Sequence, residues 1–526
     1  MLKTIRRALG PKKGVLSEGT NIVINCEKLE RRVALVENGS LEEYNIERTE
    51  DDNIVGSIFK GRVKNIEQGL KAMFVDIGME KNAFLHFWDA IPAALDGGLE
   101  EIKRADKKKK KITSGDIPSI YPVGSEVMIQ VTKGPISTKG PRVTTNVSLP
   151  GRYLVLMPLN EQFGISRKVD DPKERKRLRK ILEKLSVPEG MGVIMRTVAA
   201  GKRVRHFVRD LSILLDQWGA ICDSRDSGRA PIRCFDEPDL VERTVRDFLT
   251  EEVGEVICDD QETVERMRKL VGPISLRAKR RVKLWEDRQP LFEKLGIQKQ
   301  IEEAMFREVR LPCGGYIVID ETEALISIDV NTGRNKGGKN VDKTILQTNL
   351  ESAEEVARQL RLRNMGGLVV VDFIDMRNRK DQQAVYRLMK DRMARDRAKT
   401  QILPISALGL MEMTRQRLNE SLSLSTQDLC EHCQGRGRIK SLTTMSVELQ
   451  RSIGTILLRH DTKNHDLAIS VSPELMERLR TLDEELLADM QRKHHGKLTF
   501  RVDPTYYREK FVITNAKTGD EVATSL

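Results

Sequence analysis

The sequence predicts a multidomain protein that mixes α+β and α/β architecture. Its 526 residues provide material for three to five domains, because single domains commonly contain ~100–200 residues. One stretch has the pattern of a strand, a helix and a second strand, which is typical of a parallel βαβ unit. Another has a series of short strands separated by turns, which is typical of a small β-barrel.

The N-terminal part of the chain has the pattern of a β-hairpin followed by that barrel. Two alternating runs between Arg32 and Ile46 flank Asn38 and Gly39, a dipeptide that favours a tight hairpin turn. The expected barrel strands are residues 57–64, 71–77, 83–86 and 126–133. Their spacing predicts a small barrel of the oligonucleotide-binding kind.

Aromatic residues gather in the predicted barrel, although they make up only 4% of the chain. They lie among cations: Phe74, Phe84, Phe87, Trp88, Lys60, Arg62, Lys64 and Lys71. Aromatic faces stack on unpaired bases and cations follow phosphates, so this set suits single-stranded nucleic acid. The alternative is that Phe74 and Phe84 belong to the ordinary barrel core. The lysine-rich run 103–111 is expected to be a mobile loop that adds nonspecific phosphate attraction.

After the barrel, a helix is predicted from Asp171 to about Leu185, because Asp is a good N-cap and proline follows it. A strand then ends at a turn formed by Arg196 and Thr197. A planar guanidinium beside a hydroxyl suits a terminal phosphate. The alternative is an exposed turn with a stray arginine. From Arg203 to about residue 303 the pattern is mostly helical.

Two apolar strand-like runs end at Asp329 and Asp372, and an amphipathic helix expected over residues 341–364 joins them. Right-handed crossovers bring the carboxyl ends of parallel strands to one sheet edge. We therefore expect the two carboxylates to converge, with Asn331 and Asp375 as further oxygen donors. Such hard ligands suit Mg²⁺ or Mn²⁺. The alternative is that both aspartates merely cap the loops after their strands.

The loop between these two runs comes within one residue of a nucleotide-binding motif. Residues 333–340 follow that pattern except for Asn340, which stands where Ser or Thr would hold Mg²⁺. We expect instead a flexible basic loop that meets RNA phosphates. A nucleotide-driven RNA remodelling factor is the corresponding alternative.

Two of the seven cysteines form a metal-binding pattern. Cys430 and Cys433 enclose two residues and are followed by glycines that permit a tight turn around a thiolate pair. Two thiolates supply half of a structural zinc site, so the same pair from another subunit is the simplest completion. His432 as a third ligand, a redox pair and an unmetallated turn are the alternatives. The other five cysteines are expected to be small buried apolar residues.

Composition indicates the class of partner. A formal net charge of +12, with 32% charged residues, favours a polyanion. No apolar stretch approaches the ~20 residues that a membrane span requires. The basic N-terminal segment has no long apolar core followed by a cleavage site, so we expect a cytoplasmic protein.

Several motifs along the chain together resemble the ribonuclease E/G family. They cover nearly the whole sequence in the family's order and lie at residues 74–78, 153–158, 192–197, 326–331, 349–363, 366–376, 409–417 and 430–437. The absence of a long scaffold after the catalytic half resembles the shorter, ribonuclease G-like members. Glu431 replaces the usual proline, Lys399 replaces an arginine near the sensor, and the insertion near Lys107 lengthens a barrel loop.

The resemblance implies an endoribonuclease that cleaves single-stranded RNA to 5′-phosphate and 3′-hydroxyl products in rRNA processing and mRNA decay. It implies Asp329 and Asp372 as Mg²⁺ ligands supported by Asn331. The residues that would hold the RNA and its 5′-monophosphate are Phe74, Phe84, Lys133, Arg196 and Thr197. Cys430 and Cys433 would form half of a zinc link in a homodimer, and dimers could pair into a tetramer. The alternative function is a non-catalytic RNA-binding or ribosome-assembly factor.

The resemblance also implies a domain order. A ribonuclease H-like part is split between residues 1–52 and 242–304, with an S1-type barrel at 53–139 and a 5′-phosphate sensor region at 140–241 inserted. A deoxyribonuclease-like catalytic domain follows at 305–426, then the zinc link at 427–441 and a small C-terminal domain at 442–526.

Overall fold

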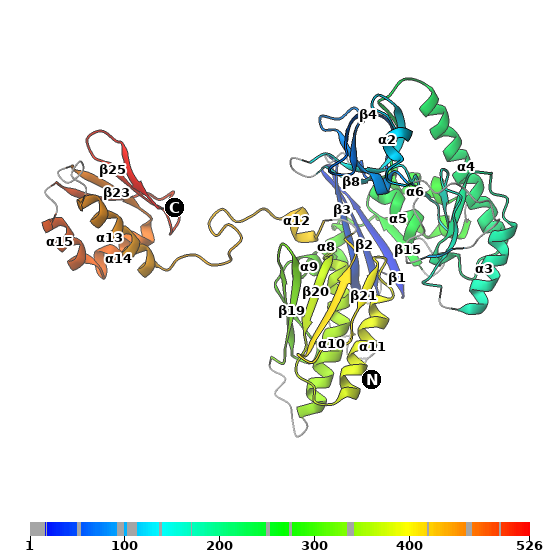
Figure 1. The fold of residues 1–526 in the computed structure, drawn as a ribbon. Helices are drawn as coiled ribbons and strands as arrows, with labels where there is room; N and C mark the ends of the chain where they lie inside the picture. The colour runs from blue at the N-terminus through cyan, green and yellow to red at the C-terminus, as the bar shows by residue number, and fades with distance from the viewer. Residues whose placement is uncertain are drawn as a thin grey trace. The chain divides into compact units, whose positions relative to one another are not determined.

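The computed structural model describes residues 16, 18–49, 54–91, 99–101, 113–135, 139–169, 171–248, 253–272, 276–333, 341–417, 420–458, 465–493 and 496–525. The chain forms two compact units, 1–423 and 424–526. Each unit combines sheets with helices (Figure 1). The prediction of a mixed α/β multidomain protein is therefore confirmed. The lysine-rich run 103–111 and residues 334–340 lie outside the described residues.

The first sheet of unit 1 has five strands in the order β16-β15-β1-β2-β3. Its N-terminal strands form an antiparallel meander: β1 (Thr20–Cys26), β2 (Glu30–Glu37) and β3 (Ser40–Arg48). The predicted hairpin turn is confirmed, because Asn38 and Gly39 have φ of 51° and 86°, as a type I′ turn requires. On the other side of β1 lie two parallel strands, β15 (Val253–Cys258) and β16 (Val282–Leu284).

Helices that follow the barrel in sequence pack on this first sheet. They are α5 (Leu240–Phe248), α6 (Gln261–Val271), α7 (Leu276–Arg281), α8 (Leu291–Lys294) and α9 (Ile297–Glu303). The prediction that residues 203–303 are mostly helical is confirmed, but it did not include three short strands, β14 (Ile232–Phe235), β15 and β16. Short apolar runs on buried strands have no alternation and cannot be told from buried helix by pattern alone.

A closed barrel follows β3 in the chain. Its strands are β4 (Ile58–Glu67), β5 (Ala72–Asp76), β6 (Ala83–His86), β8 (Glu126–Lys133) and β9 (Arg142–Thr144). The barrel closes because β4 pairs with both β5 and β8, and β14 also pairs with β4. A short helix, α2 (Ile117–Ile120), precedes β8. The prediction of a small barrel is confirmed, and the structure adds β9 to the four strands expected from the sequence.

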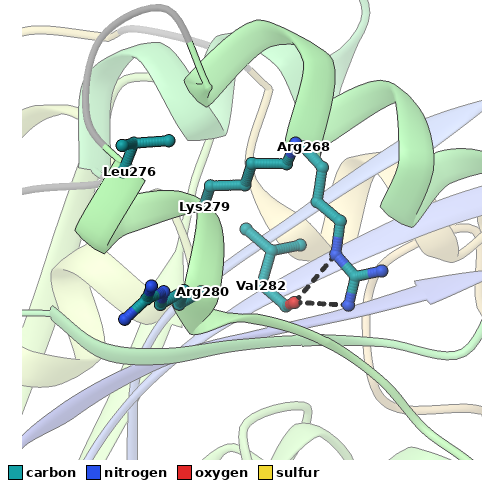
Figure 2. Close-up of a pocket in the computed structure, with 5 residues that line it drawn as sticks. All are labelled: Arg268, Leu276, Lys279, Arg280 and Val282. Carbon is teal, nitrogen blue, oxygen red and sulfur yellow. Dashed lines mark hydrogen bonds between the residues drawn. The ribbon is translucent and has the colours of Figure 1, made fainter.

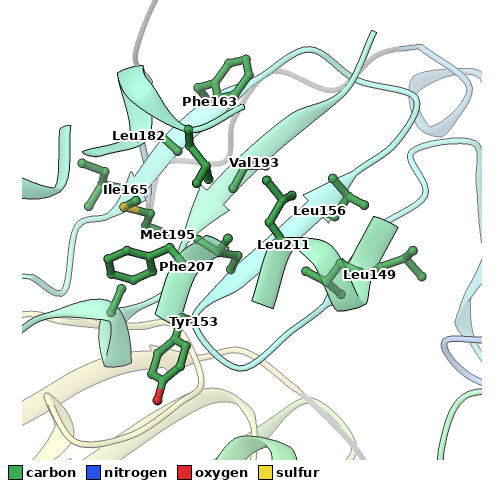
Figure 3. Packing of buried hydrophobic residues seen from close by; sticks show 14 of the residues in the cluster. Leu149, Tyr153, Leu156, Phe163, Ile165, Leu182, Val193, Met195, Phe207 and Leu211 are labelled. Atoms are coloured by element: carbon green, nitrogen blue, oxygen red, sulfur yellow. The ribbon is translucent and has the colours of Figure 1, made fainter. Parts of the chain in front are cut away.

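The next part of unit 1 is a second five-stranded sheet, in the order β10-β11-β13-β12-β7. Its strands are β7 (Leu99–Glu101), β10 (Leu149–Pro150), β11 (Leu154–Met157), β12 (Phe163–Ser166) and β13 (Gly192–Met195). Helices α3 (Pro172–Lys184) and α4 (Val204–Asp226) enclose its core, which Figure 3 shows around Phe207. The predicted first helix is confirmed, with the Asp171 side chain accepting from Lys173 N.

The last sheet of unit 1 carries both predicted metal ligands. Its order is β17-β18-β19-β20-β22-β21. The strands are β17 (Glu308–Arg310), β18 (Tyr316–Glu321), β19 (Leu325–Asn331), β20 (Gly367–Asp372), β21 (Thr400–Ile402) and β22 (Leu410–Arg415). Helix α10 (Val341–Leu362) joins β19 to the parallel β20, as predicted, and α11 (Arg379–Met393) follows β20. Both helices bury one face of the sheet.

Unit 2 is a small α/β fold. Its four-stranded sheet has the order β24-β23-β25-β26. The elements are α13 (Leu442–Leu458), β23 (Leu467–Val471), α14 (Pro473–Thr481), α15 (Glu484–Lys493), β24 (Leu498–Val502), β25 (Phe511–Asn515) and β26 (Glu521–Thr524). A short helix, α12 (Leu422–Thr426), spans the boundary with unit 1. Among the described helices of the chain, none is long and apolar enough to cross a bilayer.

Candidate active site

Asp329 and Asp372 occupy paired positions at the carboxyl ends of two parallel strands. They are register partners on β19 and β20, and such strands lie ~4.8 Å apart. Ile328, Val330 and Val371 are buried against the helices. Because side chains alternate along a strand, the two aspartates point to the opposite face of the sheet, where both are exposed. Carboxylates placed side by side on one face suit a shared cation.

Asn331 lies on the same strand and face as Asp329. Its Nδ2 donates a hydrogen bond to Asp329 Oδ2 at 2.7 Å. A hydrogen-bonded neighbour of this kind fixes the orientation of a ligating carboxylate. The structure thus places Asn331 as a support for Asp329, and it gives Asp329 a reason to hold one rotamer.

Sequence reasoning missed a buried residue that shapes the other side of this site. Asn349 on α10 has an exposed fraction of 0%. Its Nδ2 donates to Ile374 O at 2.8 Å, and Ile374 N donates to its Oδ1 at 3.1 Å. These two bonds fix the segment between Asp372 and Asp375. The available signal was an amide on the apolar face of an otherwise amphipathic helix.

The glycine at position 409 lets the loop before β22 approach this segment. Gly409 has φ of +84°, and a Cβ built there would lie 3.3 Å from Asp375 Oδ1. Asp375 is exposed at the same end of the sheet. The third carboxylate is therefore held beside the ends of β20 and β22, in the place where the sequence predicted a further oxygen donor.

The predicted RNA-stacking pair lies outside the barrel core. Phe74 and Phe84 are register partners whose ring centroids lie 5.9 Å apart in an edge-to-face arrangement. Both are half-buried, whereas their neighbours Met73 and Leu85 are fully buried on the inner side. Rings on the outer face of a small barrel remain available to bases.

The two other aromatic residues of this segment divide between core and surface. Phe87 is only 4% exposed and belongs to the barrel core, so its predicted stacking role was wrong. Trp88, directly after it in a 3-10 turn, is 65% exposed. Lys133 is exposed at the end of β8, where its register partner Arg142 is also the partner of Phe84.

Three of the cations predicted to follow the RNA backbone are instead paired with carboxylates of the barrel. Lys60 and Arg62 contact Glu126 at 2.8 and 3.7 Å, and Lys64 contacts Asp76 at 3.3 Å. Lys60 Nζ also donates to Gly228 O at 2.9 Å. These ion pairs connect strand β4 to the neighbouring strands β8 and β5. An RNA phosphate would have to compete with these carboxylates for the three cations.

The predicted phosphate sensor is a partly buried, anchored arginine rather than a stray one. Arg196 Nη1 donates to Gly151 O at 2.6 Å and to Asp247 Oδ1 at 2.7 Å. Its Nε and Nη2 make no hydrogen bond to any residue in the described part of the chain. Thr197 is exposed, and its Oγ1 lies 3.2 Å from Ser166 Oγ. One edge of the guanidinium is thus held while the other stays available.

Carboxylates accompany the guanidiniums around Arg196. Burial by itself raises the pKa of the Asp247 carboxyl, but the charges of Arg196 and Arg246 outweigh burial and hold that pKa below its usual range. Burial lowers the pKa of the Arg397 guanidinium, which also interacts with Asp247. Because Arg246 also contacts Glu237 at 3.1 Å, these guanidiniums have more than one counter-ion.

The predicted zinc half-site lies in unit 2. Cys430 is exposed and Cys433 half-buried, and backbone N–H groups of Gly437 and Gly435 lower the pKa of the Cys433 thiol. The His432 ring lies 4.9 Å from the Tyr507 ring. Among the described residues, no third Cys, His, Asp or Glu completes a ligand cluster with this pair.

A basic hollow lies between α6, α7 and β16. Figure 2 shows its lining residues: Arg268, Leu276, Lys279, Arg280 and Val282. Arg268 donates to Val282 O from Nε at 3.2 Å and from Nη2 at 2.9 Å, so its fork is already engaged. None of the described residues that line this hollow is a carboxylate, the ligand type that a hard divalent cation prefers.

Comparison with known proteins decides the family. Residues 148–418 match the Ribonuclease E/G family. The sequence is 34% identical to Ribonuclease G of Escherichia coli over 93% of this chain and 98% of that protein. This chain belongs to the ribonuclease E/G family.

Other relatives fit this membership. Ribonuclease G of Haemophilus influenzae is 33% identical over 94% of this chain and 99% of that protein. Ribonuclease E of the same organism is 38% identical over 95% of this chain and 52% of its own length. The predicted resemblance is confirmed, as is the prediction of an endoribonuclease of the ribonuclease E/G type.

Proposed function

We propose that this ribonuclease E/G family member is a Mg²⁺-dependent endoribonuclease for single-stranded RNA. The observation that carries the proposal is the side-by-side placement of Asp329 and Asp372 on one exposed sheet face. Two carboxylate oxygens with a neighbouring amide suit Mg²⁺, which prefers oxygen ligands and retains several waters.

The chain's own residues divide the work at this site. Asp329 and Asp372 would hold the metal, and Asn331 would keep the Asp329 carboxylate oriented through its 2.7 Å hydrogen bond. A bound Mg²⁺ makes hydroxide available at neutral pH and offsets charge on the attacked phosphate. Attack of water on phosphorus with departure of the 3′-oxygen leaves a 5′-phosphate and a 3′-hydroxyl, the products that we propose.

Substrate binding is assigned to the outer face of the barrel. Phe74 and Phe84 would stack on unpaired bases, and Lys133 would contact a phosphate. Stacking contributes about 1–3 kcal/mol per base. The exposed Trp88 lies two residues after β6 and offers a further stacking surface. A preference for unpaired RNA follows, because paired bases cannot splay onto these rings.

Recognition of the 5′ end is assigned to Arg196 and Thr197. The free edge of the Arg196 fork and the Thr197 hydroxyl would bind a 5′-monophosphate. The test compares cleavage of a 5′-monophosphorylated RNA with its 5′-hydroxyl twin, with and without Mg²⁺. Arg196→Lys should reduce the preference for the monophosphate, whereas Arg175→Lys, on α3, should not change it. Equal rates on both RNAs in the unmodified protein would contradict this assignment.

The remaining expectations form part of the same proposal. We assign the first sheet and its helices to a ribonuclease H-like part, the βαβ-containing sheet to a deoxyribonuclease-like catalytic part, and unit 2 to a zinc link with a small C-terminal domain. Cys430 and Cys433 would share Zn²⁺ with a second protomer, giving a dimer or a tetramer. rRNA processing and mRNA decay in the cytoplasm would be the biological setting.

The experiment that tests the reaction separates cleavage from binding. Asp329→Asn and Asp372→Asn should abolish cleavage while leaving RNA affinity within a few-fold of the unmodified protein. Asp391→Asn is the matched control, because Asp391 is exposed on α11, which covers the opposite face of the sheet. Retained cleavage in both active-site variants would remove the two aspartates from the reaction. RNA binding without any cleavage by the unmodified protein would instead favour a non-catalytic RNA-binding or ribosome-assembly factor.

A further inference from the structure

Two cysteines that are far apart in the sequence meet in the first sheet. Cys26 ends β1 and Cys258 ends β15, and their Sγ atoms lie 3.9 Å apart across 232 residues of sequence. Cys258 is 0% exposed and Cys26 half-buried. The expectation of a buried apolar cysteine is confirmed for Cys258, which lies in a hydrophobic core. The two thiols are nevertheless neighbours, because a sheet brings together strand ends that the sequence separates.

The position of this pair in the sheet favours ligand binding. From the central β1, the chain passes to β2 and β3 on one side and later to β15 and β16 on the other. The parallel strands β1 and β15 therefore flank a point where the strand order reverses. In sheets with parallel strands, ligands bind beyond the carboxyl ends of the strands at such a point, and both thiols lie there.

A carboxylate completes a three-ligand cluster. One ligand atom from each of Cys26, Cys258 and Asp259 lies within 4.8 Å of the other two. Asp259 Oδ1 accepts from Cys26 N at 2.8 Å, and Oδ2 accepts from Asn25 Nδ2 at 2.6 Å. Arg32 Nε in turn donates to Asn25 Oδ1 at 2.7 Å. Metal-binding carboxylates are oriented by hydrogen bonds of this kind.

The thiols also have the surroundings of metal-bound sulfur. Asp260 N donates to Cys258 Sγ at 3.5 Å, and Thr263 Oγ1 lies 3.7 Å from Cys26 Sγ at the first turn of α6. The negative charges of Asp259 and Asp260 act on the Cys26 thiol. Reactive thiols occupy electropositive surroundings. Two adjacent carboxylates instead make this a site that attracts a cation.

We propose that Cys26, Cys258 and Asp259 bind a thiophilic divalent cation such as Zn²⁺. Tetrahedral Zn²⁺ with Zn–S bonds of ~2.3 Å places two sulfurs about 3.8 Å apart, close to the 3.9 Å found here. Each thiol loses its proton to solvent as its metal–sulfur bond forms. Because Cys26 is half-buried, we assign the fourth ligand to a water on its side of the cluster. The bound ion would tie together the ends of the two central strands.

The test isolates this site from the Cys430 and Cys433 pair. The full-length Cys430→Ser/Cys433→Ser variant is loaded with Co²⁺, and bound metal per chain and thiolate-to-cobalt charge-transfer absorption are measured. We expect one bound ion that gives this absorption, and loss of that ion and of the absorption when Cys26→Ser is added. Cobalt held by Asp329 and Asp372 has no thiolate ligand and gives no such absorption. Cys222→Ser is the matched control, because Cys222 is a half-buried thiol on α4, and it should change neither reading.

Three results would overturn the proposal. The first is absence of the thiolate-to-cobalt absorption in the Cys430→Ser/Cys433→Ser protein, and the second is its persistence after Cys26→Ser. The third is a disulfide between Cys26 and Cys258: the protein purified without reductant would have a mass lower by two hydrogens, and reduction would restore two thiols that can be alkylated. If Cys26→Ser does not fold, Asp259→Asn keeps both thiols and should weaken cobalt binding at least tenfold; unchanged affinity would count against the site.

Discussion

The ends of two pairs of parallel strands in unit 1 form an instructive contrast. At β19 and β20, Asp329 and Asp372 are exposed and present oxygen ligands. At the ends of β1 and β15, Cys26 is half-buried and Cys258 is buried, and both offer sulfur ligands. The same topological arrangement thus prepares two different ligand sets. Hard oxygen donors at an open face suit a hydrated catalytic ion, whereas the softer sulfur donors at the more buried strand ends suit a thiophilic ion.

The largest expected effect comes from placing a sulfur ligand in the oxygen site of Asp329 and Asp372, as in the Cys26 and Cys258 site. Asp372→Cys replaces a hard ligand by a soft one, so cleavage with Mg²⁺ should fall by about 10³-fold. Because thiolates bind Cd²⁺ and Mn²⁺ better than Mg²⁺, these ions should restore part of the rate to Asp372→Cys but not to Asp372→Ala. The measurement is single-turnover cleavage across the three metals. Full activity of Asp372→Cys with Mg²⁺ would remove Asp372 from the metal site.

A smaller effect should follow from loosening the support of the oxygen site. Asn349→Leu leaves Ile374 N and O without their buried partners, which costs about 1–3 kcal/mol of stability. The displaced segment should also lower kcat by roughly 10²-fold. Ser352→Ala is the control, because buried Ser352 Oγ bonds only within α10, to Thr348 O at 2.8 Å. Equal loss of kcat in both variants would show a general stability effect.

Each site has an asparagine that donates a hydrogen bond to one of its carboxylates, and these two asparagines allow a matched test. Asn25→Ala removes a hydrogen bond to Asp259, and Asn331→Ala removes one to Asp329. Each should weaken its own site by about tenfold. Asn25→Ala should lower cobalt affinity at the thiol site without slowing cleavage, and Asn331→Ala should do the reverse. Crossed effects, measured by titration and by cleavage assay, would mean that the two sites are coupled.

The smallest effect concerns a carboxylate whose partner is an arginine rather than a metal. The pKa of Asp247 is lowered in the folded state, so its stabilising contribution is present above the unfolded pKa and is lost as pH falls through the folded pKa. Asp247→Asn should therefore be less stable than the unmodified protein at neutral pH. The difference in unfolding free energy should shrink below about pH 4. Denaturant titration at several pH values measures it, and a constant difference would contradict the ion pair.

Much of the oxygen site could be predicted from the sequence. The apolar runs before Asp329 and Asp372, with a helix between them, encode a right-handed βαβ unit whose strand ends must meet. The Asn38 and Gly39 turn and the Asp171 cap were equally visible, because turn and cap chemistry is local. The supporting role of Asn349 was not visible, since its partner at Ile374 is a backbone segment 25 residues away.

The sequence by itself determined the family, the barrel, and the chemistry available at the ends of its strands. Tertiary structure alone decided that Cys26 and Cys258 are neighbours, that Phe87 lies in the core, and that barrel cations such as Lys64 are paired. The physical reason is the range of each signal. Periods of 2 and 3.6 residues report which face of an element is buried, but strand order and side-chain pairing depend on contacts between segments that no local pattern records.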